Sequence, residues 1–184
     1  MSTQLATSED FKFFDFLAPY RWPNKSFDTI AEYRQLVHDG DIQIETMLEN
    51  ALCVASRGRY SRIAEDHADC SDGSDAKKAV SCFRNNDILR DHWMNSFSIT
   101  NLKNKTGLIR ALCLSKQTGR FHFFAIPYNA YKGMNRVDII LDTSSGYREP
   151  QGIPRGKWTC FEVDSFEKLA RVRHQDQARI KYWG

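Results

Sequence analysis

Residues 108–127 read LIRALCLSKQTGRFHFFAIP, and this stretch does most to define the fold class. Two apolar runs, 108–115 and 120–127, flank a polar segment that ends in a glycine. Apolar runs of this length around a glycine-containing turn are typical of a β-hairpin. Additional strands are indicated by four more apolar or alternating runs, at 76–83, 96–103, 137–141 and 158–163. The sequence therefore predicts a central mixed or antiparallel sheet of about five strands.

Helices are expected before this sheet. Thr7 and Asp10 resemble a capping box at the start of a first helix. Ser26 would cap a second helix that ends at Gly40. A third helix, capped by Asp41, is indicated by apolar residues that recur at helical spacing. These residues are Ile44, Met47, Leu48, Ala51, Leu52 and Ala55.

A last helix is expected after the sheet, because Asp164 and Glu167 form a second capping box. Helices, then strands, then a closing helix define an α+β (mixed α/β) fold class. The chain has 184 residues, of which 41% are hydrophobic. That length and composition predict a single domain that spans residues 1–184.

The sequence also predicts a cytoplasmic protein with no membrane partner. Its longest apolar stretch, residues 121–128, is far too short to span a bilayer. The segment MSTQLATSEDF at the beginning lacks the charged and apolar regions of a signal peptide. The five cysteines are odd in number and widely separated, which favours reduced thiols over a disulfide framework.

Charge is distributed unevenly along the chain. Five acids fall between residues 65 and 75, namely Glu65, Asp66, Asp69, Asp72 and Asp75. Residues 92–137 contain no acid but seven bases, namely Lys103, Lys105, Arg110, Lys116, Arg120, Lys132 and Arg136. A compact acidic group within a basic chain matches the needs of a cation-dependent phosphodiesterase. Bases can neutralise backbone phosphates while acids hold the metal.

The acidic group contains the short motif Asp75-Ala76-Lys77, followed by an expected strand. Residues two apart on a strand project to the same face, so Asp75 and Lys77 should point together. The acid can ligate Mg²⁺, and the lysine can orient the attacking water or offset charge on the phosphorus. Asp66, nine residues earlier, is the preferred partner acid, and Asp72 could reach the same ion from a loop.

This arrangement resembles the PD-(D/E)XK nuclease superfamily, which includes many restriction endonucleases. The resemblance covers residues 41–127 and implies a mixed sheet flanked by helices. It implies catalytic roles for Asp66, Asp75 and Lys77, and a metal site that holds Mg²⁺, or Mn²⁺ in its place. The ligands would be Glu49 from the third helix, with Glu45 as a weaker choice, together with Asp66, Asp72 and Asp75. The chain departs from the family in lacking a proline before the first acid and in having aspartate in the acid-x-lysine pair.

Two alternatives remain open at this stage. In a second register Asp75 is the first acid and Asn101-Leu102-Lys103 replaces the acid-x-lysine pair. Alternatively the acids are a solvated surface cluster, and the chain is a non-catalytic nucleic-acid-binding or inhibitor protein.

We expect double-stranded DNA as the partner, although an RNA-cleaving enzyme fits the same basic surface. A homodimer would let two sites cut two strands. The candidate nucleic-acid contacts are Arg57, Arg59, Lys103, Lys105 and Arg110.

Overall fold

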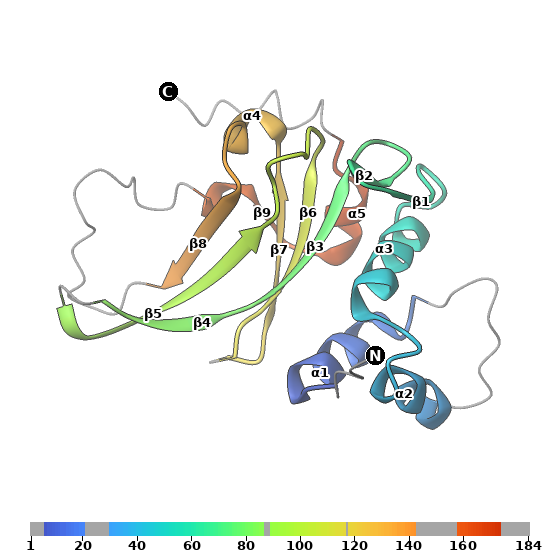
Figure 1. Cartoon of the computed structure of the whole chain (residues 1–184), viewed down its shortest axis with the longest axis horizontal. Coiled ribbons are helices and arrows are strands. Elements are labelled where there is room, and N and C mark those ends of the chain that lie inside the picture. Colours follow the sequence, from blue (N-terminus) through green and yellow to red (C-terminus); the bar gives the residue numbers. More distant parts are fainter. Residues whose placement is uncertain (1–5, 21–29, 87–88, 117, 143–157, 174–184) are drawn as a thin grey trace.

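A four-stranded sheet in the order β3-β6-β7-β9 lies at the centre of the computed structural model (Figure 1). The structure describes residues 6–20, 30–86, 89–116, 118–142 and 158–173. The four strands are β3 (Asp75–Val80), β6 (Ile109–Leu114), β7 (Phe121–Ile126) and β9 (Glu162–Val163). Strand β3 runs parallel to β6, and the other neighbours are antiparallel. The sheet is therefore mixed.

Strands β6 and β7 form the hairpin that the sequence predicts, with Leu114 opposite Phe121. At the turn the backbone N–H of Gly119 donates to the carbonyl of Ser115 at 2.8 Å, and Gly119 has a positive φ of 69°. Glycine adopts this conformation without the steric cost that a Cβ brings. Every residue of β6 is buried, because both faces of this strand are covered.

A second sheet packs against one face of the first. It has the order β4-β5-β8 and is antiparallel, with strands β4 (Cys82–Asn86), β5 (Leu89–Thr100) and β8 (Arg136–Asp142). Ser81 alone separates β3 from β4, so the single strand expected at 76–83 is in fact divided between two sheets. The apolar residues that pack together in this half of the core include Ala79, Phe97, Ile99, Ile109, Ala111, Phe124, Val137 and Ile139.

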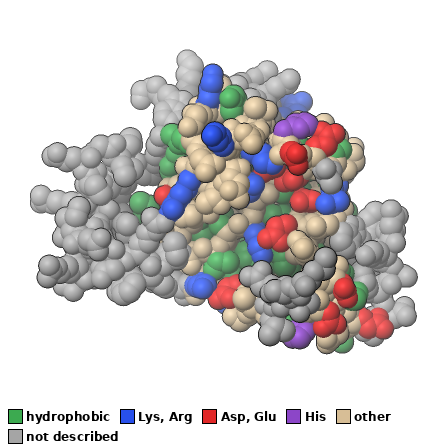
Figure 2. All heavy atoms as spheres, in the orientation of Figure 1, with side chains coloured by type: hydrophobic (Ala, Val, Ile, Leu, Met, Phe, Trp, Pro, Cys, Tyr) green, Lys and Arg blue, Asp and Glu red, His purple; other side chains and the backbone are tan. Residues whose placement is uncertain are grey.

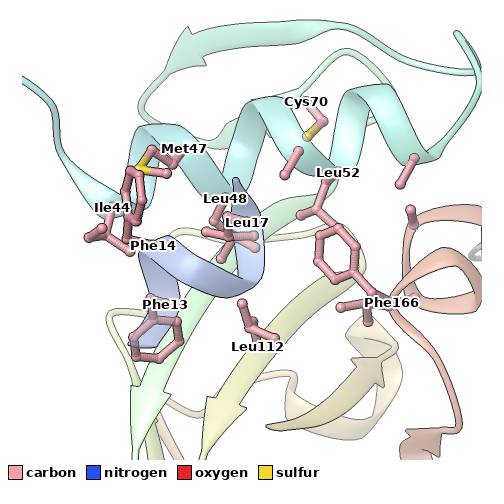
Figure 3. Close-up of a cluster of buried hydrophobic side chains, with 14 of the residues drawn as sticks. Phe13, Phe14, Leu17, Ile44, Met47, Leu48, Leu52, Cys70, Leu112 and Phe166 are labelled. Carbon is pink, nitrogen blue, oxygen red and sulfur yellow. The ribbon is translucent and has the colours of Figure 1, made fainter. Parts of the chain in front are cut away.

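Helices cover the opposite face of the central sheet. They are α1 (Ser8–Leu17), α3 (Ile44–Ala55) and α5 (Phe166–Arg171), and α2 (Ile30–His38) packs beside α1, where Arg34 of α2 pairs with Asp15 (Figure 1). All six residues of the apolar stripe predicted for the third helix are buried on α3. They join α1, α5 and the sheet in a second core cluster whose members include Phe13, Phe14, Leu17, Leu112 and Phe166 (Figure 3).

Three short elements complete the chain. A hairpin of β1 (Arg62–Glu65) and β2 (Ala68–Cys70) connects α3 to β3. A one-turn helix, α4 (Tyr128–Tyr131), follows β7, and η1 (Thr159–Phe161) precedes β9. Hence the segment 158–163, expected as one strand, is mostly a 3₁₀ turn. The α+β fold class is confirmed, with four strands in the central sheet and helices at both ends.

The helix termini agree with the sequence only in part. The capping box of Thr7 and Asp10 is present at the start of α1. Helix α3 begins after Gln43 rather than Asp41, and α5 is capped by Ser165, whose hydroxyl accepts from the backbone of Lys168. Ser26 lies outside the described residues.

Among the helices of the described ranges, no membrane-spanning candidate is found, because none combines the length and the apolar character that a span requires.

Candidate functional site

Asp75, the first residue of β3, lies at the centre of the candidate site. Its side chain is only 1% exposed, and each of its two oxygens faces a lysine amine. Lys77 Nζ lies 3.0 Å from Asp75 Oδ2, and Lys105 Nζ lies 2.7 Å from Asp75 Oδ1. Asp75 and Lys77 thus point to the same face of β3, as their two-residue spacing predicts. That face is the one shared with Ala79, toward the second sheet.

The carboxylate of Asp75 is neutralised but not fully hydrogen-bonded. Among the described residues, no donor reaches either of its oxygens with the direction of a hydrogen bond, although both amines are within ion-pair distance. Buried carboxylates usually accept several directed hydrogen bonds, because desolvating a charge is costly. Asp75 therefore retains the capacity to coordinate a further electrophilic group.

A second carboxylate, Asp69 on β2, lies beside Asp75. One of its oxygens, Oδ2, accepts a hydrogen bond from the backbone N–H of Ala76 at 2.8 Å. The pKa of Asp69 is raised to about 6, mainly because the side chain is buried and in part because the negative charge of Asp75 is close, while the hydrogen bond from Ala76 opposes the shift. Two neighbouring carboxylates that resist simultaneous ionisation form a pair that a cation would stabilise.

Asp66 does not take the position that the sequence analysis assigned to it. It lies in the turn between β1 and β2, and its side chain is exposed. Only its backbone carbonyl approaches the site, where it accepts from Lys105 Nζ at 2.9 Å. The acid nearest Asp75 on this hairpin is Asp69, because the turn ends at residue 67 and β2 begins immediately after it.

Lys105 belongs to the site rather than to the open surface, since its side chain is only 12% exposed. Its loop, between β5 and β6, packs closely on the turn before β3. A Cβ on Gly107 would lie 1.8 Å from the backbone oxygen of Gly73, so no larger residue fits there without displacing backbone. Tyr131 Oη donates to the Gly107 carbonyl at 2.5 Å. These contacts hold Lys105 against Asp75.

Tyr131 is a further member of the site that the sequence analysis did not identify as such. Its ring is buried in the core between the two sheets. Burial, and secondly the negative charge of Asp75, raise the pKa of its hydroxyl. Tyr131 therefore remains a neutral hydrogen-bond donor near the carboxylate.

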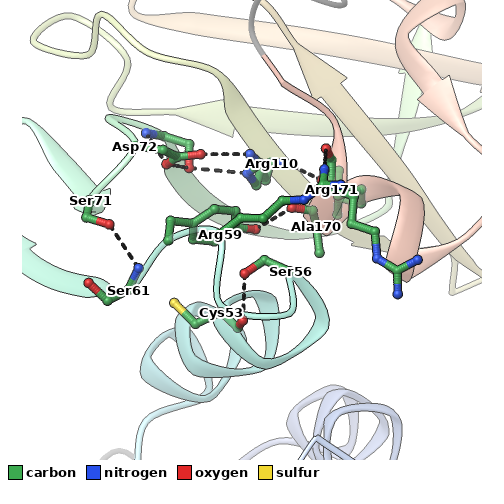
Figure 4. A network of polar contacts seen from close by, with 12 residues as sticks. Cys53, Ser56, Arg59, Ser61, Ser71, Asp72, Arg110, Ala170 and Arg171 are labelled. Atoms are coloured by element: carbon green, nitrogen blue, oxygen red, sulfur yellow. Dashed lines mark hydrogen bonds and ion pairs between the residues drawn. The ribbon is translucent and has the colours of Figure 1, made fainter.

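Asp72 and Arg110 form a separate, structural network (Figure 4). Arg110 is 2% exposed, and its Nη2 lies 2.9 Å from Asp72 Oδ2. Its other nitrogens donate to Ser74 Oγ and to the carbonyl of Leu169, and the guanidinium stacks over Tyr60. Arg110 is thus buried in an ion pair with Asp72, away from the open surface. The expected roles of Arg110 as a nucleic-acid contact and of Asp72 as a metal ligand stay predictions. Each group is already occupied by the other.

The glutamates of α3 are also engaged in ion pairs. Glu49 pairs with Arg62 Nε, and its negative charge adds to the raised pKa of Asp69, so it lies near the carboxylate pair. Glu45 lies 3.3 Å from Lys78 Nζ. Lys78 projects from the helix-facing side of β3, so Glu45 lies across the sheet from Asp75 and Lys77.

The remaining candidate contacts differ in exposure. Arg57, Arg59 and Lys103 are exposed, but Arg59 Nη1 donates to the carbonyl of Arg171 at 3.0 Å. The second register expected Lys103 to lie on a strand and pair with Asp75. Lys103 instead lies in the loop after β5, and Lys105 is the lysine of this loop that contacts Asp75. Figure 2 shows Lys and Arg side chains around α4, beside a group of acids over the β1–β2 hairpin.

The carboxylate pair suits one kind of cation better than others. Across the described ranges, no three His, Cys, Asp or Glu side chains converge as a group that could hold a metal ion. A closed zinc-type site is thus not formed there. Mg²⁺, in contrast, is commonly held by one or two carboxylates with water and substrate phosphate as its other ligands. Asp69 and Asp75 are the two neighbouring carboxylates that could hold such an ion.

Comparisons with known proteins add no relationship. Neither protein-family models, nor curated proteins, nor solved structures gave a match to this chain.

Proposed function

We propose that the chain is a Mg²⁺-dependent nuclease that hydrolyses phosphodiester bonds of double-stranded DNA. The observation that carries this proposal is the buried Asp75, which lies between two lysine amines and beside a second carboxylate. Two acids and two lysines are groups that can support metal-dependent phosphodiester hydrolysis, the acids by holding the cation and the lysines by stabilising charge on the phosphate. The resemblance to PD-(D/E)XK nucleases is retained in this proposal, with Asp69 in place of Asp66.

In this proposal Asp69 and Asp75 hold the cation. A bound Mg²⁺ supplies a water of lowered pKa and stabilises negative charge on the phosphate. It would also offset the carboxylate charge that now attracts the two amines. Lys77 and Lys105 could then direct their amines to the phosphate oxygens, where negative charge develops during cleavage. Tyr131 keeps the Lys105 loop in place through Gly107.

Exposed bases would bring the duplex to this site. Lys103 and Lys132 are exposed, and both precede strands that begin at the same end of the two sheets. Contacts of this kind are to phosphates and do not read sequence. Cleavage of both strands would be served by a homodimer, and we place the activity in the cytoplasm, where reduced thiols persist.

A specific observation favours a second candidate, a non-catalytic nucleic-acid-binding protein. Two lysines already neutralise Asp75, which would complete an ion-pair cluster without any metal. On this alternative the basic surface binds nucleic acid, and the carboxylates only maintain the fold.

Incubation with supercoiled plasmid distinguishes the two candidates. The nuclease proposal predicts nicked or linear DNA with Mg²⁺ and intact plasmid with EDTA. A salt-sensitive gel shift without cleavage, with or without Mg²⁺, supports the binding protein instead. An RNA substrate in parallel tests whether the proposed preference for DNA is correct.

A further inference from the structure

The amine of Lys105 lies between two oxygen atoms that come from different parts of the chain. Lys105 Nζ is 2.7 Å from Asp75 Oδ1, on β3, and 2.9 Å from the backbone carbonyl oxygen of Asp66, in the turn between β1 and β2. The amine donates its hydrogen bond to the Asp66 carbonyl, because among the described residues no donor is directed at the oxygens of Asp75. One positive charge thus lies between a buried carboxylate oxygen and a carbonyl oxygen, and both are oxygens that hard metal ions accept as ligands.

Lys77, the other lysine beside Asp75, is placed differently. Its Nζ lies 3.0 Å from Asp75 Oδ2, and within the part of the chain that the structure describes it has no second oxygen partner. Lys77 also belongs to the same strand as Asp75, whereas Lys105 comes from the loop between β5 and β6. Of the two ammonium groups, that of Lys105 is therefore the one held between oxygens in the manner of a bound ion.

We propose that the ammonium group of Lys105 occupies a cation site, and that Mg²⁺ displaces it to bind the oxygens of Asp75 and of the Asp66 backbone. This inference rests on the proposed function, and it adds a ligand to Asp69 and Asp75, which that function already uses. The added ligand is the carbonyl of Asp66, not its carboxylate, since the side chain of Asp66 is exposed.

The surroundings of Lys105 allow this exchange. The backbone of the loop is fixed, because the Lys105 N–H donates to the carbonyl of Leu102 at 3.0 Å and Gly107 packs tightly on neighbouring backbone. The lysine side chain is a flexible stem, and Asn104 and Thr106, on either side of it in the chain, are exposed. Only the side chain therefore needs to move, and solvent lies beside it.

Displacement implies competition between the lysine and the metal. Mg²⁺ has to break the ion pair of Lys105 with Asp75, and the displaced amine then repels the ion from nearby. Lys105→Met keeps an unbranched apolar stem but removes the charge, so the variant should bind Mg²⁺ about tenfold more tightly than wild type.

The first test measures Mg²⁺ binding to the metal-free, full-length chain by isothermal titration calorimetry. Lys105→Met should show the tighter binding, with circular dichroism as the folding control. Lys103→Met is the matched control, because it makes the same charge change two residues earlier in the same loop. Lys103 is exposed, so its charge is screened, and the affinity of this variant should stay within about twofold of wild type.

The second test uses the wild-type protein, so misfolding of a variant cannot obscure it. Lysines are acetylated with acetic anhydride in EDTA or in saturating Mg²⁺, and the extent of acetylation at each lysine is measured by mass spectrometry. Mg²⁺ should increase the acetylation of Lys105, because its amine moves into solvent, and should leave that of Lys103 unchanged.

Two results would overturn the inference. One is a folded Lys105→Met that binds Mg²⁺ no more tightly than wild type, and the other is a wild-type chain saturated with Mg²⁺ in which the acetylation of Lys105 is unchanged. Plasmid cleavage tests the nuclease proposal separately. A chain that cleaves plasmid but gives either result contradicts this inference alone. A chain that cleaves nothing, but in which Lys105→Met gains Mg²⁺ binding, contradicts the nuclease proposal alone.

Discussion

Replacing Asp69 by asparagine should stabilise the protein at neutral pH. The pKa of Asp69 is raised from 3.8 to about 6, so the folded chain binds this proton more tightly than the unfolded chain. The stability associated with that proton is fully present below about pH 4 and is lost as the pH rises through about 6. Asparagine carries no charge, and its oxygen can still accept from Ala76. The variant should therefore keep the stability that wild type loses when Asp69 ionises.

The size of the effect follows from the pKa. A shift of about two units corresponds to roughly 3 kcal/mol if the site were fully shielded. Asp69 is only half-buried, and solvent screening reduces this value. We expect Asp69→Asn to raise the free energy of unfolding by about 1–2 kcal/mol near pH 7.5, and to have little effect near pH 4.

Urea denaturation of both proteins at the two pH values measures this difference. Asp72→Asn is the matched control, since hydrogen bonds from Ser74 and the pairing with Arg110 lower the pKa of Asp72 despite the opposing effect of its burial. Its substitution should destabilise the chain at neutral pH. Mg²⁺ should stabilise wild type but not Asp69→Asn. The reasoning is refuted if Asp69→Asn is less stable than wild type at neutral pH while remaining folded.

Four further variants test the roles assigned to neighbouring residues. Arg110→Met should lower the free energy of unfolding by about 3–5 kcal/mol in urea denaturation, because it leaves buried polar groups unpaired. Unchanged stability together with weakened DNA binding would instead support Arg110 as a nucleic-acid contact. Gly107→Ala should lower the free energy of unfolding by about 1–3 kcal/mol, because its Cβ meets backbone, and an unaltered melting temperature would contradict that close contact. Lys105→Gln should slow single-turnover cleavage by roughly 10²–10³-fold with little change in binding. Lys103→Gln should instead weaken DNA binding and lower the slope of log affinity against log salt by about one. If Lys103→Gln and Lys105→Gln slowed cleavage equally, the assignment of Lys105 to the site and of Lys103 to binding would be contradicted.

Local patterns carried most of the fold prediction. The β6–β7 hairpin and the apolar stripe of α3 are signals within one contiguous segment, and both are confirmed. The parallel pairing of β3 with β6 was not predicted, because it joins segments more than thirty residues apart and has no local signature. Strands β1 and β2 are too short for a periodic pattern to reveal them.

The candidate site was predictable to the same extent. The period of a strand places Asp75 and Lys77 on one face. It does not reveal which earlier acid lies nearby, because that depends on the turn at 66–67. Arg110 offered a usable signal, since a single charge inside the apolar run LIRALCL indicates a buried ion pair more than an exposed contact. The position of Lys105 depends on a loop contact that only the structure provides.

The most direct test of the proposed metal site is plasmid cleavage by Asp75→Asn. Asparagine preserves the shape of the side chain but removes the charge that would hold Mg²⁺. The account predicts that this variant, folded by circular dichroism, binds plasmid at least as tightly as wild type, because one negative charge near the phosphates is gone. It also predicts that cleavage in Mg²⁺ falls below detection. Cleavage at the wild-type rate by well-folded Asp75→Asn would contradict the assignment of this site.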